Sequence, residues 1–170
     1  MISNEEAEKV RGRLYGQDKL IFDISCETGL RISDILNIKK REINKIMYIR
    51  EAKTKKHKII EFSDKLYKRL KAYEDHNADV ANYAFYSTRK PQRHIHRSTY
   101  HRHLKKAIQG TQIDCSAHST RKLYAMNIFE RDKNIFDVQK ALNHKYITTT
   151  ATYLGLDLAQ LIREAAERKT

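Results

Sequence analysis

Six side chains suited to phosphate chemistry stand in order along the 170-residue chain. Arginine and histidine can donate hydrogen bonds to the negative charge that spreads over a phosphodiester while it is cleaved. Lysine can protonate a leaving 5′-oxygen. A tyrosine hydroxyl, with an ordinary pKa near ~10, can attack phosphorus when nearby cations favour its ionisation. The six residues are Arg31, Lys53, His118, Arg121, His144 and Tyr153.

Most of these residues lie in, or at a fixed spacing from, three short segments. Segment 28–36 reads TGLRISDIL and carries Arg31 just after a glycine that can end a helix. Segment 118–121 reads HSTR, which puts its histidine and arginine on one face of a helix. Segment 142–144 reads LNH, and Tyr153 follows its histidine by nine positions. Each segment alone is a weak signal, whereas the ordered set is a strong one.

Several lysines compete for the role of proton donor. Lys53, Lys55, Lys56 and Lys58 crowd one short stretch, and a run of like charges is usually a solvated surface. Lys53, which is followed by Thr54, and Lys55 are the candidates for the proton donor. We expect Lys55 and Lys56 to contact DNA phosphates.

The charge balance favours a polyanionic partner. Thirty-four Lys and Arg against 21 Asp and Glu give a formal net charge of +13 and a pI near 9.7. Nucleic acid is the leading candidate. A membrane surface is the rival, but the chain lacks tryptophan and any apolar run near the roughly 20 residues that cross a bilayer. The acidic start of the chain does not read as a signal peptide. Cys26 and Cys115 read as free thiols, and we expect a cytoplasmic protein with no membrane partner.

Hydrophobic spacing predicts a mainly α fold with one small antiparallel β-sheet (α+β). Ser3 and Glu6 form a potential capping box for a first helix. Two β-rich runs around a basic tip predict a hairpin, and the polar stretch around Pro91 predicts a loop at 87–93. Ser98 is the expected cap of the helix that follows that loop. Predicted helices after the first cover 17–28, 33–36, 63–73, 98–109, 119–131, 135–142, 148–153 and 158–168; strands cover 46–49 and 59–62, with a short extended piece at 84–86.

Four histidines between positions 94 and 103 raise the question of a metal site. They form two His-x-His pairs interleaved with arginines, and a zinc site needs a more regular scaffold. We therefore expect a loop and helix start that face DNA, with Arg97 and Arg102 as DNA contacts and with no metal or other cofactor. The aromatic residues Tyr83, Phe85 and Tyr86 could stack on bases, but a core role is favoured.

The ordered set resembles the tyrosine recombinase (phage integrase) family from about residue 17 to 160. The family's first box, T-G-L-R-x-x-[E/D]-[L/I]-L, matches 28–36, and its H-x-x-R box matches 118–121. Its late L-G-H element matches 142–144, with Asn143 in place of glycine, a substitution that left-handed backbone tolerates. Lys122 stands after the second-box arginine, where the family often has His or Arg, and we expect it to contact DNA.

The resemblance implies a role for each matched residue. Arg31, Arg121 and His144 would hold the scissile phosphate, while Asp34 would orient the pocket without reacting. Lys53 would protonate the leaving 5′-hydroxyl and His118 would assist proton transfer to and from the tyrosine. Tyr153 would form a 3′-phosphotyrosyl intermediate on double-stranded DNA, so that rejoining would need neither ATP nor metal.

The resemblance also implies an organisation and leaves two rival functions. We expect residues 1–170 to form a single catalytic domain without the family's N-terminal core-binding domain. The family acts as a homo-tetramer on DNA through a C-terminal helix, for which Leu156, Leu158, Leu161 and Ile162 are candidates, whereas the free chain is expected to be a monomer. One rival is a DNA-binding regulator that keeps the fold without the chemistry. The other is a type IB topoisomerase that relaxes DNA.

Overall fold

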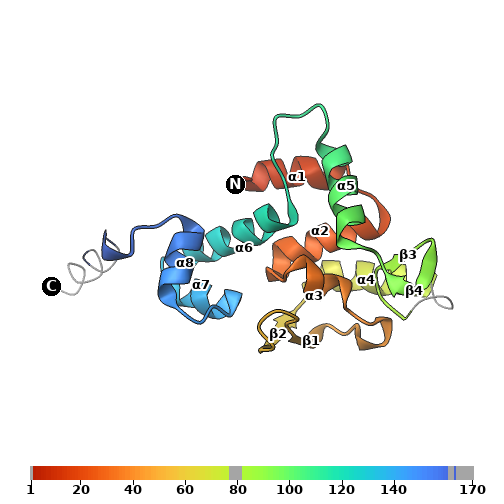
Figure 1. The fold of residues 1–170 in the computed structure, drawn as a ribbon, viewed down its shortest axis with the longest axis horizontal. Helices are drawn as coiled ribbons and strands as arrows, with labels where there is room; N and C mark the ends of the chain where they lie inside the picture. The colour runs from red at the N-terminus through yellow and green to blue at the C-terminus, as the bar shows by residue number, and fades with distance from the viewer. Residues whose placement is uncertain (1, 77–81, 161–162, 164–170) are drawn as a thin grey trace. The chain divides into compact units, whose positions relative to one another are not determined.

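The computed structural model describes residues 2–76, 82–160 and 163. The chain folds as two compact units, Met1–Tyr124 and Ala125–Thr170, and their boundary lies inside helix α6 (Ala117–Asp132). In the described part, eight α-helices accompany two separate two-stranded antiparallel sheets (Figure 1). The mainly helical α+β prediction is confirmed, although one sheet was expected. No helix among the described residues has the length and apolar character needed to span a bilayer.

Three helices of the first unit begin or end at local signals in the sequence. The capping box of α1 is present, because Ser3 and Glu6 each accept a hydrogen bond from the other's backbone N–H. Helix α2 ends at Gly29, whose φ of 61° is the left-handed conformation that glycine adopts at low cost. Ser63, at the start of α4, accepts from the backbone N–H of Leu66. The helices of this unit before α6 are α1 (Asn4–Gly12), α2 (Gly16–Thr28), α3 (Ile32–Leu36), α4 (Asp64–His76) and α5 (Arg97–Ile108).

Helix α2 is central to the core of the first unit. Its residues Leu20, Ile21, Phe22 and Ile24 are almost completely buried, and α2 packs against α1, α3, α4 and α5. Neighbouring residues of a helix point to different sides, so burial of these four residues within about one and a half turns means that α2 is covered on several sides. Helix α2 is thereby held in place by its neighbours.

The predicted first hairpin is confirmed. Strands β1 (Ile46–Arg50) and β2 (His57–Glu61) pair antiparallel, with Tyr48 opposite Ile59. Met47, Ile49 and Ile60 point into the core, while Tyr48 and Ile59 are exposed on the outer face. The basic tip therefore projects from a hairpin that is anchored on one face only.

The loop predicted around Pro91 is wrong. Residues Tyr86–Ser87 (β3) and Lys90–His94 (β4) form a second short hairpin with an irregularity in its register between Tyr86 and Ser87. Proline has no N–H to give to a ladder, but a strand at the edge of a sheet accommodates it where no such bond is needed. In a two-stranded sheet both strands are edges, so Pro91 does not prevent the pairing.

The expected cap of α5 is also wrong, and the start of α6 lies earlier than predicted. The N-cap of α5 is His96, whose Nδ1 accepts from the Ser98 backbone N–H at 3.3 Å, so Ser98 is a helix residue. Helix α6 begins at Ala117 rather than at residue 119, which places His118 in its first turn. Both shifts are about two residues, the usual uncertainty of a helix end read from sequence.

The second unit contains the rest of α6 together with α7 (Ile135–Leu142) and α8 (Ile147–Leu154). Helix α7 has the predicted bounds, and α8 is one residue longer at each end than predicted. Helices α7 and α8 pack against each other, with Val138, Leu142 and Leu154 buried. The helix expected at 158–168, including Leu161 and Ile162, lies largely outside the described residues.

Candidate active site

The two predicted catalytic arginines of the first unit lie at one turn of the chain, the turn that ends α2. Arg31 is the N-cap of α3, two residues after Gly29. Arg121, on α6, is buried and donates from Nη1 to the Gly29 carbonyl oxygen. The motifs that carry these arginines are separated by 90 positions and converge here. Two arginines held at one turn provide the type of donor that binds a phosphate.

Thr28 explains how this turn keeps its shape. Its Oγ1 donates to the Ile24 carbonyl oxygen at 2.7 Å and accepts from the Leu30 backbone N–H at 3.3 Å. Tyr124 packs so closely on the other side that a Cβ added to Gly29 would lie 2.2 Å from Cδ1 of its ring. Glycine is therefore required by both the backbone conformation and the available space.

A buried carboxylate that sequence reasoning missed accompanies Arg31. Glu51 is fully buried, and its Oε1 lies 2.7 Å from Arg31 Nη1, an ion pair that lacks hydrogen-bond alignment. Its other oxygen accepts from Thr54 Oγ1 at 2.5 Å. Met47 and Ile49 are buried at alternate positions of β1, and Glu51 continues that inward alternation. An acid on the apolar face of a strand was the signal that could have found it.

Asp34 ties the arginine turn to the hairpin tip. Its Oδ1 accepts from the Ala52 backbone N–H at 2.8 Å, next to Lys53. Burial raises the pKa of Asp34, with the Ala52 hydrogen bond opposing that shift. The buried carboxylate of Asp34 thus contacts the backbone of the hairpin tip rather than solvent.

The predicted lysines of the tip are solvent-exposed. Lys53, Lys55 and Lys56 lie in the turn between β1 and β2, and Lys55 has a left-handed backbone with φ of 59°. The Glu51 backbone closes this turn, donating to the Lys56 carbonyl and accepting from the Lys55 N–H, both at 2.9 Å. The geometry of the tip does not select between Lys53 and Lys55 as proton donor.

Lys58 is the lysine that lies inside the site, and sequence reasoning treated it only as part of the charge run. Its Nζ donates to the Thr28 carbonyl oxygen at 2.6 Å and lies 5.3 Å from the Tyr124 ring centroid. Burial, reinforced by the neighbouring Arg121, lowers the pKa of Lys58 to about 8. Lys58 shares the inward face of β2 with Ile60, which was the available signal.

His118 and Lys122 lie one turn apart on α6, close to Arg121. His118 is solvent-exposed, but partial burial and the adjacent Arg121 and Lys122 lower the pKa of its imidazole. A neutral imidazole can accept a proton, whereas a protonated one only donates. The electrostatics of this turn therefore favour the proton-accepting form of His118.

The remaining two predicted residues, His144 and Tyr153, meet in the second unit. Their rings pack edge to face with centroids 5.6 Å apart, and His144 Nδ1 lies 3.1 Å from Thr150 Oγ1. Asn143 ends α7 with φ of 58°, so asparagine serves at the left-handed position where the family has glycine. The tyrosine and the late histidine thus form one local group on the α7–α8 pair.

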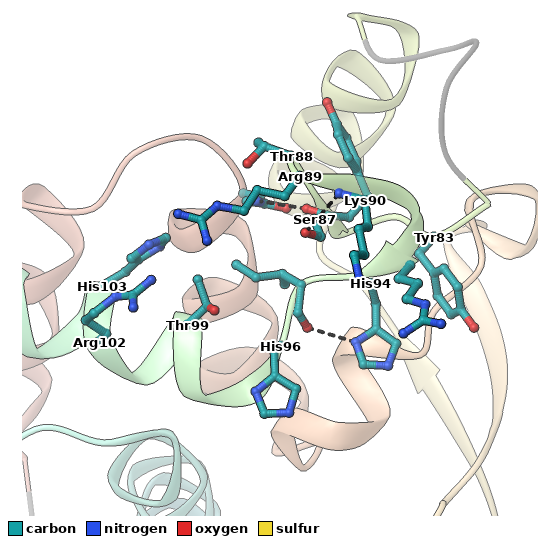
Figure 2. A pocket seen from close by; sticks show the side chains of 14 residues that line it. Tyr83, Ser87, Thr88, Arg89, Lys90, His94, His96, Thr99, Arg102 and His103 are labelled. Atoms are coloured by element: carbon teal, nitrogen blue, oxygen red, sulfur yellow. Dashed lines mark hydrogen bonds between the residues drawn. The ribbon is translucent and has the colours of Figure 1, made fainter.

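A basic pocket lies at the other end of α2, lined by the second hairpin and the start of α5 (Figure 2). Its volume is about 740 Å³, and its lining includes Arg102 but not Arg97, the two residues of this region that are predicted to contact DNA. In Figure 2 the Arg89 side chain reaches from the hairpin towards Arg102 and His103 of α5. Sequence reasoning did not assign Arg89, Lys90 and Arg93, which also line the pocket.

The clustered histidines make local contacts in this region. His94 Nδ1 lies 2.8 Å from the Ile95 carbonyl, His96 Nδ1 lies 2.7 Å from Ser98 Oγ, and His103 Nδ1 lies 2.8 Å from Asp18 Oδ2. Across the described ranges, no three His, Cys, Asp or Glu side chains are grouped as metal ligands would be.

The aromatic residues beside the pocket differ in their burial. Phe85 is fully buried, in line with the favoured core role, whereas Tyr86 lines the pocket. Tyr83 packs edge to face on His94, and the Lys39 Nζ lies 3.3 Å from the centroid of the tyrosine ring.

Both cysteines are free thiols, as predicted. Burial raises the pKa of Cys26 and of Cys115 to about 12. The thiolate is the reactive form of cysteine, so neither thiol is suited to nucleophilic chemistry at neutral pH.

Comparison with curated proteins gives relatives of one kind. The tyrosine recombinase of Thermosipho africanus is 30% identical over 143 residues, which cover 81% of this chain and 49% of that protein. The XerA tyrosine recombinase of Pyrococcus furiosus is 30% identical over 156 residues, 89% of this chain and 54% of that protein. The probable integrase/recombinase YoeC of Bacillus subtilis is 29% identical over 162 residues, 91% and 88% of the two chains. The chain therefore spans about half the length of two of these relatives and most of the third.

Solved structures share the fold at lower identity. A crystal structure of XerA recombinase superposes with a TM-score of 0.77 at 24% identity, covering 99% of this chain and 64% of that one. A lambda integrase dimer bound to a COC′ core site gives 0.71 at 20% identity, covering 90% and 47%. The sequence model of the phage integrase family matches residues 4–159 of this chain. The chain belongs to the phage integrase family of tyrosine recombinases.

Proposed function

We propose that this chain is the catalytic domain of a site-specific DNA recombinase that cleaves and rejoins double-stranded DNA through a covalent 3′-phosphotyrosyl intermediate at Tyr153. The observation that carries the proposal is the convergence of Arg31 and Arg121 on the turn that ends α2. Two arginines fixed at one turn, from motifs 90 positions apart, supply preorganised charge for a phosphate in its transition state.

The reaction is a transesterification in two steps. The Tyr153 oxygen attacks the scissile phosphorus, the bond from phosphorus to the 5′-oxygen breaks, and the 3′-phosphate becomes an ester of the tyrosine. The tyrosyl proton passes to His118, whose lowered pKa favours the neutral imidazole. Lys53 gives a proton to the leaving 5′-oxygen. Rejoining is the reverse attack by a 5′-hydroxyl, and no energy source or metal enters the balance.

Arg31, Arg121 and His144 bind the non-bridging oxygens of the phosphate in this proposal, and Asp34 keeps the hairpin tip in register with them. The exposed cations Lys55, Lys56, Arg97 and Arg102, together with the half-buried Lys122, contact the duplex backbone. The basic pocket beside α5 extends that surface. It lies at the other end of α2 from the arginine turn, roughly 20 Å away at 1.5 Å per helical residue. Contacts this far from the reacting phosphate position the duplex.

The test is covalent capture on nicked suicide duplexes drawn from a randomised pool enriched for binding to the protein. The wild type is expected to form a complex that survives SDS, and Tyr153→Phe is expected to form none. Tyr146→Phe is the matched control, because Tyr146 is an exposed tyrosine of the same unit. A complex that persists in Tyr153→Phe would remove Tyr153 as the nucleophile.

Covalent capture, together with duplex binding and plasmid relaxation, separates the rival functions. Tight duplex binding without a covalent complex would favour the DNA-binding regulator. Relaxation of a supercoiled plasmid that lacks the selected site would favour topoisomerase activity. The recombinase proposal includes a single catalytic domain, a cytoplasmic location, a homo-tetramer on DNA and a monomer in the absence of DNA. Sedimentation with and without a selected duplex tests the change in assembly.

A further inference from the structure

Lys58 occupies an unusual position for a lysine. Most lysines keep their ammonium group in water, yet the Nζ of Lys58 lies on the inward face of β2 and donates to the Thr28 carbonyl oxygen at 2.6 Å. Thr28 is the last residue of α2, so its carbonyl belongs to the end of the helix, where backbone oxygens lack intrahelical donors. Lys58 therefore supplies a hydrogen bond that the helix itself does not provide.

The next carbonyl along the chain is held in the same way. Arg121 donates to the Gly29 carbonyl oxygen, so two consecutive carbonyls at the negative end of the α2 dipole each receive a cation from a distant element. Arg31 follows two residues later. The orientation of the Thr28–Gly29 backbone sets the direction in which the Arg31 backbone leaves the turn.

The charges around Lys58 make this arrangement costly. Arg121 on α6 and Arg31 at the start of α3 repel the ammonium group, whereas Glu51 in the hairpin and Asp34 on α3 attract it. Desolvation is the largest influence and favours the neutral amine. A methionine of similar length would avoid that cost, so the presence of a cation calls for a functional reason.

We propose that Lys58 is a positioning residue for phosphate binding, which locks the Thr28 carbonyl so that Arg31 is presented to the scissile phosphate. This inference rests on the proposed recombinase function and adds a residue to it. The role differs from that of Lys53, which lies exposed at the tip and is assigned the proton for the leaving oxygen. Lys58 does not itself transfer a proton in the reaction.

Two substrates distinguish positioning from proton donation. The first is a suicide duplex of the selected sequence with the natural 5′-oxygen as leaving atom. The second carries sulfur at that bridging position, and a thiolate leaves without protonation because the pKa of a thiol is only ~8.5. Loss of a proton donor is rescued by sulfur, whereas loss of a positioning residue is not.

The expected results follow for three lysine variants. Lys58→Met lowers the single-turnover rate of covalent complex formation by roughly tenfold or more on both substrates, since it removes a charge-assisted hydrogen bond. Lys53→Met slows cleavage of the oxygen substrate and recovers on the sulfur substrate. Lys45→Met removes a partly exposed cation that lies just before β1 and pairs with Asp64, and this variant cleaves both substrates at the wild-type rate.

Lys58→Arg is expected to change the pH dependence of cleavage, which a purely structural role of Lys58 would leave unchanged. Arginine keeps the donor and stays protonated at high pH, so this variant retains most of the activity and holds it further into the alkaline range than the wild type. Urea unfolding of each variant reports folding separately. If Lys58→Met does not fold, the comparison of pH profiles between Lys58→Arg and the wild type decides the question.

Three outcomes would overturn the inference. Rescue of Lys58→Met by the sulfur substrate would make Lys58 the proton donor, and wild-type cleavage by folded Lys58→Met would leave it without a role. An alkaline profile unchanged in Lys58→Arg would also count against it. If the wild type forms no covalent complex on any substrate, the recombinase proposal fails instead. In that case, duplex affinity unchanged by Lys58→Met would refute the positioning role as well.

Discussion

Replacing Gly29 with alanine should destabilise the first unit more than an ordinary glycine substitution. A residue with a Cβ pays about 1–2 kcal/mol for left-handed backbone, and Gly29 has φ of 61°. The added Cβ would also lie 2.2 Å from Cδ1 and 2.6 Å from Cε1 of Tyr124. Normal carbon contacts lie near ~3.5–4 Å, so the ring must retreat by more than about 1 Å, and overpacking of this kind costs about 1–3 kcal/mol. The two costs together give an expected loss of about 2–5 kcal/mol.

Gly110→Ala is the matched control for this prediction. Gly110 has φ of 75° and no atom within 4 Å of an added Cβ, so only the backbone cost of about 1–2 kcal/mol applies. Urea unfolding of both variants measures the free energies, and covalent capture measures the rate of cleavage. Gly29→Ala should also cleave at least about tenfold more slowly, because the altered turn carries Arg31. Equal destabilisation by the two substitutions, with cleavage intact in Gly29→Ala, would refute the close packing of Tyr124 on this turn.

Three further perturbations have defined outcomes. Glu51→Gln leaves Arg31 without its buried anion and should lower the free energy of unfolding in urea by about 2–3 kcal/mol. The loss is smaller than for a fully buried pair because 23% of the arginine side chain is exposed. An unchanged urea midpoint would contradict the pairing. Lys122→Gln should raise the pKa of His118, so that the imidazole is protonated at higher pH and the acid limb of the cleavage–pH profile moves upward; an unmoved limb would exclude Lys122 as a cause of the shift. Arg93→Gln should weaken binding evenly across duplex sequences and reduce the salt slope of log K by about one; an unchanged slope would separate the basic pocket from DNA.

Local signals account for the parts of the fold that sequence reasoning predicted. The capping box of Ser3 and Glu6 and the left-handed glycine at the end of α2 involve residues within four positions of one another. Their geometry is therefore set by the residues that the sequence displays side by side. The second hairpin was missed because Pro91 usually signals a loop, and its position on an edge strand depends on a partner that local sequence does not name.

Sequence reasoning named candidate residues for the site, but it did not predict which charged side chains are buried there. Family resemblance supplied the ordered arginines, histidines and tyrosine. It did not supply Glu51 or Lys58, because the burial of a charge depends on segments far away in sequence. Lys58 bonds a carbonyl 30 positions earlier, and Arg121 bonds one 92 positions earlier. A run of lysines gives no local reason for one of them to point inward.

The sequence separation of these contacts also bears on the order in which the molecule folds. The contacts of His144 with Thr150 and Tyr153 close loops of fewer than ten residues, and the α7–α8 pair needs no distant segment to form them. The bond from Arg121 to Gly29 closes a loop of more than ninety residues, and the entropy of closing a loop rises with its length. We expect the helical hairpin that bears the tyrosine to form early and the arginine turn to form late. A chain that is still folding would then form the segment that bears the proposed nucleophile before the arginine turn that is proposed to activate it, and cleavage would have to wait until the first unit is complete.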